Sequence, residues 1–285
     1  MKTPLLILCL ALFQLAYSQY YYNDIIGAKA FGDRMKDYVT NKVRTITAAG
    51  FDKEGAKTSD FNEWQEIIPI AIGTTSHILK ITTRNGQTVT RQSYQFDPQF
   101  RLTTLIDSSG EIKSVTSYQY NNSGNIISIR TATQDADSSE FSESEEHLWI
   151  YNNNGKPEKM WRILNGKDSS EYRLTIDEKG NPADEQQYRR GTGINPVYYY
   201  YTDNNQLSDI VRYNARAKRL LPDFMFEYDE NGRMIQKITT LSSMKSDYLI
   251  WRFAYNEKGL KTKEALFTKD KTLTGRIEYQ YTFDQ

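Results

Sequence analysis

Few side chains in this sequence are of the types that carry out catalysis. His77 and His147 are the two histidines, and Cys9 is the one cysteine. Cys9 lies in an N-terminal apolar run that we expect to be removed, which excludes a Cys–His pair and a histidine-rich metal site. His77 stands in an apolar strand, where a structural role is the better interpretation, and His147 closes an acidic segment. The sequence therefore predicts no catalytic residue, no cofactor and no metal site.

Aspartates that follow pairs of aromatic residues are a second candidate for chemistry. Asp97, Asp177 and Asp229 could be taken for the paired carboxylates of a glycosidase. Asparagine stands at the same place in three other copies of the pattern, at Asn121, Asn152 and Asn256. Asparagine cannot ionise, but both residue types hydrogen-bond the backbone of a turn. We interpret these positions as turn residues and predict a protein that is not an enzyme.

An acidic insert, residues 135–146 (DADSSEFSESEE), interrupts the regular spacing of the chain. Five of its residues fit the ligand spacing of a calcium-binding loop: Asp135, Asp137, Ser139, Glu143 and Glu146. Glu140 stands where that loop requires glycine, and no flanking helices are expected among strands. We therefore interpret the whole insert as a protruding, solvated loop rather than a calcium site.

Tyr198 and Tyr200 are the residues that we single out for ligand contact. They belong to the run of four tyrosines at 198–201, and alternation along a strand places them on the face opposite Tyr199 and Tyr201. Exposed there, their rings would stack on a carbohydrate or on the side chains of a protein partner. Packing against the curled sheet or against the N-terminal helix is the alternative.

The elements that position these residues come from one repeated pattern, aromatic-x-aromatic-Asp-x-x-Gly, as in residues 226–232. The copies recur every 24 to 31 residues from Phe100 to Gly259, which is the signature of a repeat architecture. A second turn signal lies between most copies, so each period holds two strands joined in a hairpin. The sequence predicts an all-β fold, a long antiparallel meander of tandem β-hairpins that forms a curled or spiral sheet.

Three segments are expected along the chain. Residues 1–18 have the layout of a signal peptide, with an apolar run followed by small residues. The alternative, a membrane anchor, needs a longer apolar run. Residues 19–50 form an N-terminal helical segment, in which apolar spacing predicts one short helix over about 25–42, packed on the first strands. Residues 51–285 form the β-hairpin repeat domain.

The copies at 118–124, 149–155, 226–232 and 253–259 resemble the YD repeat of rearrangement-hotspot (RHS) proteins and their secreted relatives. The resemblance covers residues 94–285. It implies a wide antiparallel sheet that curls into a shell on an extracellular or cell-surface protein, where some relatives enclose a C-terminal toxin and others are suspected of binding carbohydrate or proteins. This sequence ends in a repeat fragment with no toxin domain, so we expect a small secreted array.

Charge and composition narrow the function further. The chain has 36 basic and 36 acidic residues, so it shows no electrostatic footprint for nucleic acid or for an anionic membrane surface. We predict a secreted, non-enzymatic YD-repeat-like scaffold or binding protein of the bacterial cell surface or periplasm, with a carbohydrate or protein partner and no stable membrane insertion. The alternative is an outer-membrane β-barrel or a transport-associated component, since strands of about ten residues also suit a transmembrane barrel.

Overall fold

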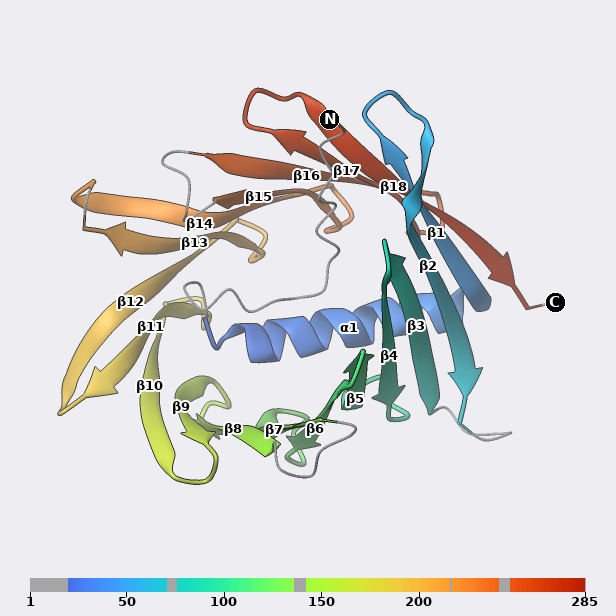
Figure 1. Ribbon diagram of the computed structural model, residues 1–285. Coiled ribbons are helices and arrows are strands. Elements are labelled where there is room, and N and C mark those ends of the chain that lie inside the picture. Colours follow the sequence, from blue (N-terminus) through green and yellow to red (C-terminus); the bar gives the residue numbers. More distant parts are fainter. Residues whose placement is uncertain (1–19, 71–75, 136–141, 216, 241–246, 285) are drawn as a thin grey trace.

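The computed structural model describes residues 20–70, 76–135, 142–215, 217–240 and 247–284. Over these residues the chain forms one helix, α1 (Asn23–Thr40), and eighteen strands (Figure 1). The strands are β1 (Val43–Asp52), β2 (Lys57–Pro69), β3 (His77–Asn85), β4 (Thr88–Phe96), β5 (Leu102–Ser109), β6 (Ile112–Tyr120), β7 (Ile126–Asp135), β8 (Ser142–Tyr151), β9 (Pro157–Leu164), β10 (Asp168–Ile176), β11 (Pro182–Arg189), β12 (Thr192–Tyr201), β13 (Leu207–Asn214), β14 (Arg219–Tyr228), β15 (Met234–Thr240), β16 (Tyr248–Tyr255), β17 (Lys261–Thr268) and β18 (Leu273–Phe283). The predicted signal peptide, residues 1–18, lies outside the described residues and stays a prediction.

The sheet closes on itself. Each strand pairs antiparallel with the next one along the chain. The last strand, β18, then pairs with β1, with Ala48 opposite Tyr279. The predicted all-β meander of hairpins with one short helix is confirmed, but the predicted curled or spiral sheet is corrected to an eighteen-stranded barrel (Figure 1). Closure pairs the two strands that would otherwise be unprotected edges.

The repeated turn has one hydrogen-bonding scheme. In the copy at 226–232, Asp229 Oδ1 accepts the backbone N–H groups of Asn231 at 3.0 Å and Arg233 at 2.9 Å. The amide oxygens of three asparagines accept the equivalent pair of bonds, at Asn121, Asn152 and Asn256. An uncharged amide thus replaces the carboxylate without loss of the turn. Gly232 takes a φ of 78°, a left-handed conformation that glycine adopts at little cost.

Where the second aromatic residue of a copy is tyrosine, its hydroxyl group ties the repeat to the preceding one. The Tyr228 hydroxyl donates to the carbonyl oxygen of Leu207 at 2.8 Å. The same bond, at 2.6 to 2.8 Å, is made by Tyr120, Tyr151, Tyr201, Tyr255 and Tyr281. Most of these tyrosines pack toward α1 or residues 20–22, so the row that they form, which we call the aromatic ladder, lies on the inner face of the barrel. Tyrosine suits the position because its ring packs in the interior while its hydroxyl satisfies a carbonyl group.

Helix α1 runs through the inside of the barrel (Figure 1). Met35 and Tyr38 are buried in a cluster with Ile46 of β1 and Leu79 of β3. The predicted helix at about 25–42 is confirmed to within two residues at each end. Its surroundings differ from the expectation, because Ala28 of α1 is buried in a cluster with Trp149 of β8. Residues 20 and 22, just before α1, pack on Tyr199 of β12.

One glycine sets how closely α1 approaches the strands. A Cβ atom on Gly32 would lie 2.4 Å from the carbonyl oxygen of Phe100, in the turn between β4 and β5. Real Cβ atoms essentially never come so close to a backbone atom. Gly27, on the same helix, has no such neighbour, because its Cβ would meet only the Asn23 side chain at 3.6 Å.

These two glycines give a matched test of the helix position. We expect Gly32→Ala to lower the free energy of unfolding by about 1–3 kcal/mol, the usual cost of overpacking. Gly27→Ala should leave stability unchanged or raise it, since alanine is the better helix former by up to ~1 kcal/mol. Thermal unfolding followed by circular dichroism measures both variants. Equal melting temperatures for the two would contradict the observed packing of α1.

Candidate functional site

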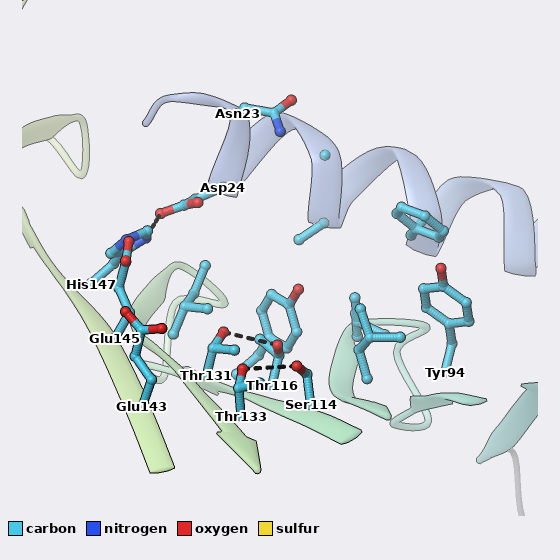
Figure 2. A pocket seen from close by; sticks show the side chains of 17 residues that line it. Asn23, Asp24, Tyr94, Ser114, Thr116, Thr131, Thr133, Glu143, Glu145 and His147 are labelled. Atoms are coloured by element: carbon cyan, nitrogen blue, oxygen red, sulfur yellow. Dashed lines mark hydrogen bonds and ion pairs between the residues drawn. The ribbon is translucent and has the colours of Figure 1, made fainter. Parts of the chain in front are cut away.

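A cavity of about 540 Å³ lies between α1 and the inner faces of strands β4 to β8. Figure 2 shows α1 on one side of it and the strands on the other. Polar groups come from both walls. The lining residues are Asn23, Asp24, Gly27, Ala28, Phe31, Tyr94, Leu102, Leu105, Ser114, Thr116, Tyr118, Ile129, Thr131, Thr133, Glu143, Glu145 and His147. The volume falls within the range of roughly 300–1,000 Å³ that is common for small-molecule sites.

Four hydroxyl groups on β6 and β7 form one wall of the cavity. Ser114 and Thr133 are register partners whose side-chain oxygens lie 2.8 Å apart. Thr116 and Thr131 form the next pair, at 2.9 Å (Figure 2). Each pair has two O–H protons, and its internal hydrogen bond uses only one of them. Each pair therefore keeps one donor and spare lone pairs for a ligand.

A charged cluster closes the cavity at the start of α1. Asp24 Oδ2 lies 2.7 Å from His147 Nδ1, and Glu145 Oε1 lies 2.7 Å from His147 Nε2 (Figure 2). Arg162 of β9 donates to both oxygens of Glu145, at 2.9 and 2.6 Å. Trp149 Nε1 donates to Asp24 Oδ2 at 3.0 Å. Helix and barrel are thus joined through one histidine between two carboxylates.

The protonation states follow from this pairing. Burial by itself would lower the pKa of His147, but the Asp24 and Glu145 carboxylates raise it to about 9. Burial would raise the pKa of Glu145, whereas hydrogen bonds from His147 and Arg162 bring it down to about 2. At neutral pH His147 is therefore an imidazolium, and both of its ring nitrogens donate.

Glu185 on β11 anchors the segment that leads into α1. Its carboxylate accepts the backbone N–H groups of Tyr21 at 2.9 Å and Tyr22 at 2.8 Å, and the Tyr199 hydroxyl at 3.1 Å. Burial raises the pKa of Glu185 to about 7, although these three donors favour its ionised form. Glu185 holds in place the chain from which Asp24 projects into the cavity.

The residues singled out from the sequence for ligand contact lie away from this cavity. Tyr200 pairs with Asp209 and has 48% of its surface exposed, and Tyr198 pairs with Asp184 and Val211 and is half-buried. Both are on the opposite face of β12 from Tyr199, which points inward. The structure therefore places them on the outer wall, and their role in binding stays a prediction.

The acidic insert is in part a strand. Asp135 ends β7, and residues 142–146 open β8, where Glu145 lies opposite Thr131 and Leu164. The predicted loop is wrong for these residues, because residues 142–146 pair with β7, and Glu145 and Glu146 pair with β9 as well, in spite of the acidic composition. Residues 136–141, which include Asp137, Ser139 and Glu140, lie outside the described residues. Whether the insert binds calcium is therefore not tested.

The sequence analysis missed most of the cavity. It discussed His147 and the insert, but it did not connect them with Asp24 or with the threonines of β6 and β7. The alternation of Glu143, Glu145 and His147 was the available signal, since residues two apart share one face of a strand. Among the described residues, no group of His, Cys, Asp and Glu could hold a metal ion. No helix in the described part of the chain is long and apolar enough to span a membrane.

No protein-family model matches the chain, and no curated protein matches it. Several solved structures are similar at a low level, and three of them illustrate it. A porin-like protein from Bacteroides uniformis is 10% identical over 85% of this chain and 97% of its own, with a TM-score of 0.38. The Photorhabdus luminescens Tc holotoxin pore is 10% identical over 78% of this chain and 16% of its own, at 0.30. A DUF1329 family protein from Desulfovibrio piger is 9% identical over 91% and 93%, at 0.19. Such scores assign no family, and the YD-repeat resemblance stays a prediction.

The charged cluster makes stability depend on pH. The pKa of His147 is about 9 in the folded protein, against about 6.5 in an unfolded chain. Its contribution to stability is therefore complete below about pH 6.5 and is lost as the pH rises through about 9. Denaturant unfolding across this range should show that loss, and His147→Gln should flatten the slope. NMR titration of the His147 ring should give a midpoint near 9; a midpoint near 6.5 would contradict the cluster.

Proposed function

We propose that this chain is a secreted, non-enzymatic binding barrel of the bacterial cell surface or periplasm, and that its lumenal cavity takes a small carbohydrate. The paired hydroxyls on β6 and β7 carry this proposal. Sugar hydroxyl groups both donate and accept, and Ser114, Thr116, Thr131 and Thr133 offer both functions in a row.

The apolar part of the cavity complements a sugar ring as well. Tyr94 and Tyr118 face the cavity, and Phe31 of α1 stacks on Tyr94 with 4.8 Å between the ring centres. The C–H face of a pyranose packs favourably on such surfaces, while its rim of hydroxyl groups needs polar partners. Aromatic and apolar groups at one end of the cavity and hydroxyls at the other provide both.

A binding role is better supported than hydrolysis. A glycosidase needs one carboxylic acid that holds a proton near neutral pH and a second carboxylate opposite it. The pKa of Glu145 is lowered to about 2, so this residue cannot act as the general acid. His147 binds the carboxylates of both Asp24 and Glu145. These carboxylates therefore hold α1 in the barrel and are not placed as a catalytic pair.

Secretion rests on two expectations from the sequence, the signal peptide at 1–18 and the YD-repeat resemblance. Closure of an even-numbered antiparallel barrel favours a second candidate, an outer-membrane barrel. The charged residues on the outer face of β9 and β10 argue against a membrane barrel. Glu171 there pairs with Lys159 at 3.3 Å and Arg173 at 2.7 Å, and charges facing lipid are costly.

The experiment is calorimetric titration of the mature chain, purified without detergent, against a panel of neutral and charged mono- and disaccharides. We expect at least one sugar to bind, and Thr131→Val to weaken that binding about 2- to 10-fold, the worth of one hydrogen bond. Thr47→Val, an exposed threonine on β1, is the matched control and should bind like the wild type. Failure of every sugar to bind, or full affinity in Thr131→Val, would refute the proposal. A chain that stays in solution only with detergent would favour the outer-membrane barrel.

A further inference from the structure

The cavity wall carries an excess of negative charge. Its described lining residues include three carboxylates, Asp24, Glu143 and Glu145, and one imidazolium, His147. None of the described lining residues is a lysine or an arginine. Arg162, which is not a lining residue, neutralises Glu145 through a bidentate salt bridge. Counted with Arg162, the wall still keeps one uncompensated carboxylate.

That carboxylate is Glu143. Asp24 and Glu145 are both bound to His147, whereas Glu143 has no salt bridge and no side-chain hydrogen bond within the described part of the chain. Glu143 lies opposite Thr133 on β7 and two residues before Glu145 on β8. The side chains of Glu143, Thr133 and Glu145 therefore lie on the same inner face (Figure 2). The Glu143 side chain is exposed to solvent, which places it where the cavity opens.

On the side of β7 and β6, the neighbours of Glu143 are uncharged donors and acceptors. Ser114 and Thr133 form the hydroxyl pair next to it, and Thr116 and Thr131 continue the row into the cavity. Tyr118 stands farther in. A ligand that reached from the opening to Tyr118 would thus meet a free carboxylate first, then the hydroxyls, then an aromatic ring.

We infer that the carbohydrate bound in this cavity carries a protonated primary amine, as an amino sugar does, and that Glu143 binds the amine while the β6 and β7 hydroxyls bind the ring. This inference rests on the proposed function. A neutral sugar would bring Glu143 no opposite charge, and an acidic sugar would be repelled by it. An ammonium group donates three hydrogen bonds, enough for Glu143 and for the hydroxyl pair of its register partner Thr133 with Ser114.

The test is calorimetric titration at about pH 6 with four probes that differ in one substituent: glucosamine, glucose, N-acetylglucosamine and glucuronate. We expect glucosamine to bind most tightly and glucuronate least. Glu143→Gln should reduce the affinity for glucosamine by about 2- to 5-fold, in line with a solvent-exposed ion pair, and should leave glucose unchanged. Glu257→Gln, an exposed glutamate outside the cavity lining, is the matched control. The preference for glucosamine should also weaken as salt is added.

The outcomes separate this inference from the proposed function. Equal binding of glucose and glucosamine would overturn the inference and leave the carbohydrate site standing. A preference for glucosamine that survives Glu143→Gln would overturn the assignment of Glu143. If none of the four probes binds and no other sugar of the wider panel does so, the proposed function itself fails.

Discussion

The need to fill the lumen of a closed eighteen-stranded sheet governs this molecule. Barrels of this size leave a wide interior, and their inward side chains do not meet across it. Here the inward face carries an aromatic ladder, which would be exposed to water without a cover. Helix α1 and residues 20–22 supply that cover along one line through the barrel. The cavity is the part of the lumen that α1 leaves open beside β4 to β8.

Polar contacts decide where α1 lies. An apolar helix would slide or rotate in an apolar tube, because the hydrophobic effect is not directional. Glu185 fixes the beginning of the segment through two backbone N–H groups, and His147 fixes Asp24. Gly32 then permits the close approach to Phe100. Buried charges are costly unless they are paired, so the Asp24–His147–Glu145–Arg162 chain also restricts α1 to one register.

The sequence predicted what local patterns encode. The Asp/Asn turns, the hairpins and the helix all follow from spacing and residue type, as Asp229 illustrates for the turns. Closure of the sheet could not be predicted from local patterns, because the pairing of β1 with β18 depends on twist and stagger accumulated over the whole sheet. The cavity was missed for the same reason: Asp24 and His147 meet only when the barrel surrounds the helix. The acidic composition of 135–146 hid the alternation that turns Glu143 and Glu145 inward.

The central claim is that α1 is held inside a closed barrel, and amide hydrogen exchange with mass spectrometry tests it most directly. The account predicts that peptides from α1 (Asn23–Thr40) exchange as slowly as those from β1 and β18, which pair with each other to close the sheet. It also predicts that Gly32→Ala speeds exchange in α1 before it does so in β1. Fast exchange throughout α1 in the wild-type protein, with the strands still protected, would contradict the account.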